Sequence, residues 1–97
     1  MSDVQDIKQN RPDALGLKYL PNPVMSNFDH EIDRDVAKEL EKGGCYAQYA
    51  GWNFCGYVWW EDESFHCEVW VYRSPQEIIS GSLEEIMDTV CEKYGDD

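Results

Sequence analysis

The sequence predicts an α+β fold of order α-β-β-β-α: a three-stranded antiparallel sheet with an N-terminal and a C-terminal helix packed on one face, preceded by an extended arm. Apolar residues recur every three or four positions in residues 28–40 and 83–94, which is the spacing of an amphipathic helix. Between these segments, residues 45–72 alternate in polarity and are rich in Tyr, Trp, Phe and Val, as strands are. A chain of 97 residues, 42% of them hydrophobic, has room for one small domain.

Residues 1–27 are predicted to form an extended or partly disordered arm. They contain three of the four prolines, and their three acidic residues are balanced by three basic ones. The whole net charge of −12 therefore belongs to residues 28–97, which we expect to fold as a single acidic domain. Apolar residues in the arm favour its packing against this domain or against a partner.

The first helix is predicted to run from Phe28 to about Lys42. Ser26 or Asn27 can cap its start, and Gly43-Gly44 can end it because glycine readily adopts the left-handed conformation of a helix stop. One apolar stripe, which would face the sheet, recurs at every fourth residue: Phe28, Ile32, Val36 and Leu40.

Three strands are predicted over residues 45–50, 52–60 and 65–72. A tight reversal at Ala50-Gly51 and a four-residue turn over 61–64 would join them. The register that follows from these connections pairs Trp59 with His66, Tyr57 with Glu68, Cys55 with Trp70, and Cys45 with Gly56.

Residues 73–81 are expected to return the chain, with Pro75 starting a turn and Ile78-Ile79 forming an extended piece or a short fourth strand. The sequence Ser82-Leu83-Glu84-Glu85 is a capping box, in which the Ser hydroxyl and a Glu carboxylate each satisfy a backbone N–H at a helix start. The second helix is then predicted to run to Tyr94.

One face of the predicted sheet is apolar enough to be the core, and the other carries an aromatic band. Aromatic side chains with polar handles are enriched in protein–protein contacts, because they offer a large area at low rotamer cost. The candidate partner-binding residues are those of this face and the acidic residues beside it: Tyr46, Tyr57, Trp59, His66, Glu68, Trp70, Tyr72, Glu61, Asp62 and Glu63. A structural alternative stays open, because aromatic cross-strand pairs also stabilise small sheets and the arm could cover them.

The chain has 20 acidic and 8 basic residues, and this excess of negative charge disfavours direct binding to nucleic acid or to an anionic membrane. No apolar run is long enough to span a bilayer and the start lacks the order of a signal peptide, so we expect a soluble, cytoplasmic protein. Acidic residues also recur at helical spacing in both predicted helices. Carboxylates on a rigid scaffold can stand in for nucleic-acid phosphates and attract a basic protein, whereas the alternative role of this charge is solubility.

The sequence carries no catalytic or cofactor-binding pattern, so we expect a non-enzymatic protein without a cofactor. There are two histidines and no nucleophile-elbow pattern, and the adjacent His66 and Cys67 would point to opposite faces of a strand. The four cysteines, Cys45, Cys55, Cys67 and Cys91, lack a CxxC spacing. We therefore expect reduced core thiols and no metal, with a Cys-based metal site as the alternative.

Two loose resemblances accompany these patterns. The element order resembles that of double-stranded RNA-binding domains, but Ser82-Leu83-Glu84-Glu85-Ile86 stands where those domains carry lysines, so RNA binding is not carried over. Residues 54–94, with three strands and a capped Ser-Leu-Glu-Glu helix, resemble the small HicB-type antitoxin domain. In size and charge the chain is similar to small acidic proteins that inhibit CRISPR, restriction or repair nucleases.

The sequence therefore favours an acidic protein-binding module, a phage-type anti-CRISPR, anti-restriction or DNA-mimic inhibitor that occupies the basic nucleic-acid-binding surface of a partner protein. The alternative is an antitoxin-like or structural subunit that forms a homodimer through its aromatic sheet face. The cysteine-based metal site is the third interpretation.

Overall fold

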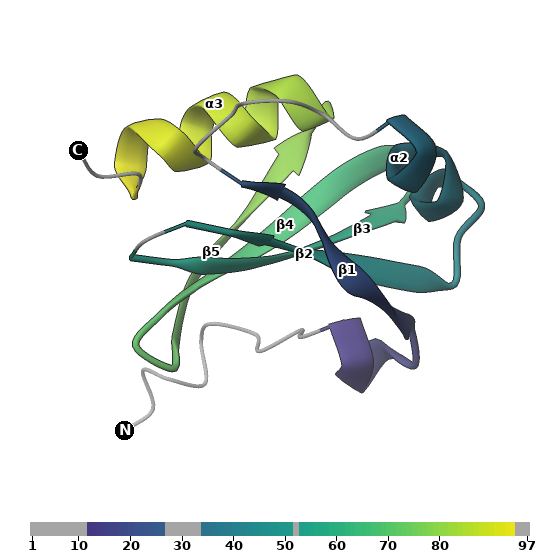
Figure 1. Cartoon of the computed structure of the whole chain (residues 1–97), viewed down its shortest axis with the longest axis horizontal. Helices are drawn as coiled ribbons and strands as arrows, with labels where there is room; N and C mark the ends of the chain where they lie inside the picture. The colour runs from purple at the N-terminus through teal and green to yellow at the C-terminus, as the bar shows by residue number, and fades with distance from the viewer. Residues whose placement is uncertain (1–11, 27–33, 52, 95–97) are drawn as a thin grey trace.

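The computed structural model describes residues 12–26, 34–51 and 53–94, which form a five-stranded mixed sheet with two α-helices (Figure 1). The strands lie in chain order; β1 is parallel to β2, and the other neighbouring pairs are antiparallel. The α+β class is confirmed, whereas the three-stranded antiparallel sheet and the order α-β-β-β-α are corrected. The elements are the 3-10 helix η1 (Pro12–Leu15), β1 (Lys18–Ser26), α2 (Arg34–Glu41), β2 (Cys45–Ala50), β3 (Cys55–Glu61), β4 (Ser64–Val71), β5 (Ser74–Gly81) and α3 (Leu83–Lys93).

Residues 18–26, which the sequence placed in an arm, form the edge strand β1. Proline lacks the N–H that a central strand needs, so Pro21 and Pro23 conceal this strand in the sequence, although an edge strand tolerates them. The pairing with β2 shifts register on either side of Pro23. Two parallel neighbours require a crossover connection, and α2 lies within it.

The helix α2 covers the second part of the predicted first helix. Leu40 is fully buried in the core, and Val36 and Ala37 pack beside it. Phe28 and Ile32, the other members of the predicted stripe, lie outside the described residues.

The hairpin of β3 and β4 has the predicted register. Its two-residue turn, Asp62-Glu63, lies between the paired residues Glu61 and Ser64. The predicted neighbours all pair: Trp59 with His66, Tyr57 with Glu68, and Cys55 with Trp70.

The predicted pairing of β2 with β3 is wrong by four residues, because Gly56 pairs with Tyr49 and not with Cys45. Ala50 pairs with Cys55, so a longer loop replaces the tight reversal expected at Ala50-Gly51. The shift is an even number of residues, and every side chain therefore stays on its predicted face.

The strand β5 is eight residues long rather than a short extended piece. Pro75 does not start the turn; it is a buried residue within β5 that pairs with Trp70 at a register shift. The turn is formed instead by Tyr72-Arg73, between the paired residues Val71 and Ser74. Neither turn residue is a usual turn former, and Pro75 was the nearest sequence signal.

The predicted capping box opens α3. The Ser82 hydroxyl accepts a hydrogen bond from the Glu85 backbone N–H, and the Glu85 carboxylate accepts one from the Ser82 N–H, both at 3.1 Å. The buried residues of this helix lie three or four apart, as predicted: Leu83, Ile86, Met87 and Val90.

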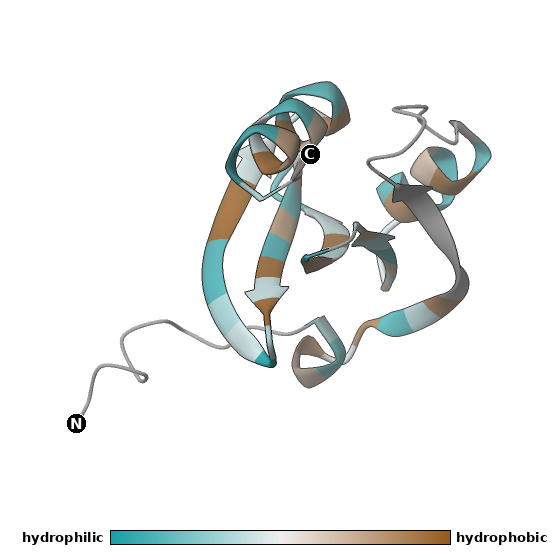
Figure 2. Ribbon diagram, turned by 60° about the vertical axis from the view of Figure 1, so that its left-hand side comes forward, coloured by the Kyte–Doolittle hydropathy of each residue, from teal (hydrophilic) through white to brown (hydrophobic). Residues whose placement is uncertain are grey.

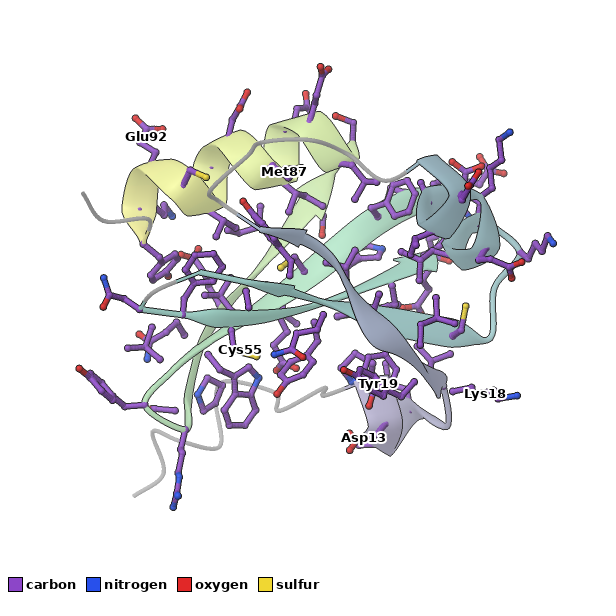
Figure 3. The ribbon with its side chains drawn as sticks, viewed as in Figure 1. Asp13, Lys18, Tyr19, Cys55, Met87 and Glu92 are labelled. Atoms are coloured by element: carbon purple, nitrogen blue, oxygen red, sulfur yellow. The ribbon has the colours of Figure 1, made fainter. Side chains whose placement is uncertain are left out.

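The core lies between one face of the sheet and the two α-helices. Its strand residues include Ala47, Val58, Cys67 and Val69, all fully buried. Hydrophobic and hydrophilic residues alternate along the strands (Figure 2), as a sheet with two different faces requires. Met87 of α3 and Cys55 of β3 lie on opposite sides of the sheet (Figure 3).

Candidate functional site

The face of the sheet opposite α2 and α3 carries the predicted aromatic band, and we call it the aromatic face. The strand pairing places these residues on it: Tyr19, Tyr46, Gln48, Cys55, Tyr57, Trp59, His66, Glu68, Trp70, Ile78 and Ser80. The short helix η1 packs against β2 and β3 on this side (Figure 1). It divides the face into a closed half, around Tyr46 and Trp59, and an open half, around Cys55, Tyr57 and Trp70.

The closed half belongs to the interior of the molecule. Trp59 is 3% exposed and Tyr46 is 7% exposed. Leu15 and Leu17, in and just after η1, line a cavity of about 230 Å³ together with Trp59. Two predicted partner-binding residues, Tyr46 and Trp59, are thus buried within the protomer, and the alternative in which residues 1–27 cover part of the band describes this half.

His66 lies beside the closed half, and its ring contacts Trp59, Ser80, Glu61 and Ser64. Its ring stacks on Trp59 with 5.5 Å between ring centroids, and its Nδ1 lies 2.6 Å from the Ser80 hydroxyl. Its Nε2 lies 2.8 Å from the backbone carbonyl oxygen of Glu61. Because a carbonyl only accepts, this geometry assigns the ring hydrogen to Nε2. Both ring nitrogens are therefore engaged in contacts with neighbouring strand residues.

The predicted acidic steering residues do not lie on one surface. Glu68, one of the predicted steering residues, is fully buried on the aromatic face. Glu61, Asp62 and Glu63 are exposed around the β3–β4 turn. This turn is at the opposite end of β4 from the turn that carries Tyr72.

A groove of about 620 Å³ opens on the open half of the aromatic face. Three predicted contact residues, Tyr57, Trp70 and Tyr72, meet there, together with Asn53, Phe54, Cys55 and Arg73. None of the lining residues is acidic, although the chain has 20 Asp and Glu residues. The volume is within the range of about 300–1,000 Å³ that is usual for small-molecule sites.

The sequence did not single out Asn53, Cys55 or Arg73 as site residues. Strand alternation already placed Cys55 on the aromatic face, so the signal for this residue was present. Asn53 and Arg73 lie in connections outside the strands, and their positions depend on a loop and a turn that were not predicted correctly.

The rim of the groove is a strained turn. Tyr72 and Arg73 have φ values of 52° and 68°, and such a turn normally contains Asn and Gly. A left-handed conformation costs a residue with a side chain about 1–2 kcal/mol. Tyr72 is nevertheless 93% exposed and has no core packing that would explain its presence.

The floor of the groove is fixed by polar contacts that join three strands. The Tyr19 hydroxyl donates to Gln48 Oε1 at 3.2 Å, and Gln48 Nε2 donates to Cys55 Sγ at 2.9 Å. These bonds run from β1 through β2 to β3, so the strands beneath the open half hold a defined position.

All four cysteines are reduced thiols that form no disulfide with one another. Burial raises the pKa values of Cys67 and Cys45, so both remain protonated at neutral pH. The Cys91 sulfur lies 3.3 Å from the hydroxyl of buried Tyr49. Within residues 12–26, 34–51 and 53–94, no three His, Cys, Asp or Glu side chains come together as metal ligands do.

A second surface lies on the outer side of α3, across the sheet from the groove. Glu84, Asp88 and Glu92 are exposed and four residues apart; we call them the acidic row. Glu92 points away from the sheet (Figure 3). The basic residue of this helix, Lys93, is bound to both carboxylate oxygens of Glu77 at 3.1 Å, so the acidic row is not neutralised along its length.

No protein-family model, curated protein or solved structure matches this chain. In the part of the chain that the structure describes, no helix is long and apolar enough to cross a membrane. Function is therefore inferred from the two surfaces, the groove and the acidic row.

Proposed function

We propose that this protein is a non-enzymatic acidic module that occupies the basic, nucleic-acid-binding surface of a partner protein and thereby inhibits it. The observation that carries the proposal is the acidic row, because Glu84, Asp88 and Glu92 are all exposed at a constant spacing of four residues. In an α-helix this spacing separates successive residues by about 6 Å along the axis. The basic groove of a partner would meet regularly spaced carboxylates here, as it meets regularly spaced phosphates on a nucleic-acid backbone.

The acidic row is held on a helix that is fixed at both ends. The capping box with Ser82 fixes the first turn of α3. At the other end, Glu77 of β5 accepts hydrogen bonds from Lys93 and from the Tyr94 hydroxyl. Charges that are already in position lose less conformational entropy on binding than charges on a mobile tail.

The net charge supports the same interpretation. At −12, the chain attracts a positively charged protein over distances longer than direct contact, which speeds association. Added salt screens this attraction, with a Debye length of about 10 Å at 0.1 M. The expected complex is therefore fast to form and sensitive to salt.

The test uses two triple variants that remove the same charge from different places. E84Q/D88N/E92Q neutralises the acidic row, and E61Q/D62N/E63Q neutralises the β3–β4 turn at an equal net charge. Proteins captured from a host lysate at low salt are identified by mass spectrometry and purified, and their binding to duplex DNA or RNA is titrated with each variant. We expect the row variant to inhibit at least about tenfold more weakly than the wild type, and the turn variant to match the wild type.

The proposal fails if the captured proteins bind no nucleic acid, or if the row variant inhibits as well as the wild type. It also fails if high salt leaves the complex unchanged, because charge would then contribute little to it.

A homodimer through the aromatic face is the second candidate, and the exposure of Tyr72 and Ile78 favours it. The burial of Tyr46 and Trp59 within one protomer leaves less of the face for a second copy. Light scattering on the wild type and on Y72S tests this candidate: a dimer that the substitution dissociates would support it, and a monomeric wild type would exclude it.

A further inference from the structure

The lining of the groove on the open half is mainly aromatic. Aromatic side chains from two strands and a turn, Tyr57, Trp70 and Tyr72, converge on it. Aromatic rings favour a planar, apolar occupant that can stack or pack edge to face against them. The three-strand hydrogen-bond chain ends at Cys55, which lies in the floor of the groove between these rings.

The charge at this groove is opposite to the charge of the whole chain. Arg73 is the charged residue of the lining, and within the described ranges it forms no ion pair. Exposed charges farther away than about 8–10 Å are largely screened at physiological ionic strength. The acidic row lies across the sheet, and Glu68, which pairs with Tyr57 on the aromatic face, is fully buried, so the charge that an occupant meets in the lining is the Arg73 guanidinium.

The backbone conformation of the turn that presents Tyr72 and Arg73 lowers the stability of the fold. Both residues have positive φ, where an Asn-Gly sequence would relieve the strain. Such strain often occurs where the side chains serve binding and not stability. The β3–β4 turn provides a comparison within the same chain, because Asp62 and Glu63 also have positive φ, at 55° and 62°, but line no groove.

We propose that the groove binds a small planar anion, an aromatic ring that carries a carboxylate, with the ring against Trp70 and Tyr72 and the carboxylate on the Arg73 guanidinium. The planar guanidinium fork matches a carboxylate and forms two parallel hydrogen bonds to it. The groove volume of about 620 Å³ accommodates such a molecule. This site is independent of the acidic row and of the function proposed for it.

The test compares two glycine substitutions at matched strained positions. Calorimetric titration measures the binding of 2-naphthoate, and of its neutral counterpart 2-naphthamide, to the wild type, R73G and E63G. Because glycine accepts positive φ, both variants should unfold at the same or a higher urea concentration than the wild type. We expect R73G to bind naphthoate at least about tenfold more weakly, E63G to bind it like the wild type, and the wild type to prefer naphthoate over naphthamide by about tenfold.

Three results would overturn the proposal: no saturable binding of naphthoate by the wild type, equal binding of naphthoate and naphthamide, or unchanged affinity in R73G. The binding of a tripeptide that ends in tryptophan is also measured, since this peptide carries both an aromatic ring and a carboxylate. Tighter binding of this peptide than of naphthoate would show that the groove is a peptide-docking site, and would also overturn the small-molecule assignment.

Discussion

Trp59 and Trp70 lie on the same face of the sheet, on neighbouring strands, yet only Trp59 is almost completely buried, with 3% of its surface exposed. The difference arises because η1 covers the half of the face that contains Trp59 and leaves uncovered the half that contains Trp70 (Figure 1). The turns at the two ends of β4 also differ: the acidic Asp62-Glu63 turn lines no groove, whereas the Tyr72-Arg73 turn forms the rim of one. Alternation along a strand assigns a side chain to a face, but what covers that face decides whether the side chain stabilises the fold or is available to bind.

Replacing the two tryptophans in turn should produce the largest difference in stability. Trp59→Ala should lower the free energy of unfolding by about 3–5 kcal/mol, because it removes a buried indole and leaves a cavity beneath η1. Trp70→Ala should cost only about 1–2 kcal/mol, because part of its ring already contacts solvent in the groove. Urea unfolding followed by circular dichroism measures both values. Equal losses would mean that the open half is as much a part of the interior as the closed half.

A smaller loss of stability is expected at Gly56, where a substitution tests whether the sheet beneath the open half is tightly packed. A Cβ atom on Gly56 would lie 2.7 Å from Cys67 Sγ and 3.1 Å from the Tyr49 carbonyl oxygen. Gly56→Ala should therefore cost about 1–3 kcal/mol of stability through overpacking. Cys67→Ala removes the closest sulfur, so the double variant G56A/C67A should be more stable than the sum of the two single effects implies. Strict additivity in this cycle would argue against the clash.

The smallest change is expected in how stability depends on pH, through Glu77 at the end of the sheet that carries the groove. The hydrogen bond from Tyr94 and the ion pair with Lys93 lower the pKa of Glu77 below its ordinary value of 4.5. A carboxyl with a lowered folded-state pKa adds stability above its unfolded pKa and loses it as the pH falls through the folded value. The wild type should therefore lose up to about 1 kcal/mol below pH 4.5 that E77Q does not lose.

Urea titrations at a series of acidic pH values measure this difference, with E92Q as a control that leaves the Glu77 contacts intact. Parallel pH profiles for the wild type and E77Q would contradict the assignment of the lowered pKa to these contacts.

Much of the local structure could be predicted, because the interactions that form it lie close together in the chain. The capping box at Ser82 needs four consecutive residues, and the β3–β4 hairpin register follows from a turn between two adjacent strands. The predicted β2–β3 pairing is displaced by four residues because Gly51 favours a tight reversal at Ala50-Gly51, whereas β3 begins only at Cys55. The even displacement still left the aromatic face correctly assigned.

The candidate site was predicted in part. Tyr57, Trp70 and Tyr72 were expected at a binding surface and line the groove, but Arg73 was missed because its turn has no glycine, asparagine or proline at its centre. Glu68 was expected to steer a partner and is fully buried, because a polar residue on an exposed-looking face can still be covered by other parts of the chain.

The amphipathic helices, the two faces of the strands, the central hairpin and the large acidic surplus can be predicted from the sequence, because periodicity, capping and composition act over a few residues or over the whole chain at once. The place of β1 in the sheet beside β2, and the closure of one half of the aromatic face by η1, follow from the tertiary fold. Both depend on contacts between segments far apart in the chain, such as the Tyr19–Gln48 hydrogen bond with its separation of 29 residues. Burial at such a distance is set by which surfaces meet, and local sequence patterns do not encode that choice.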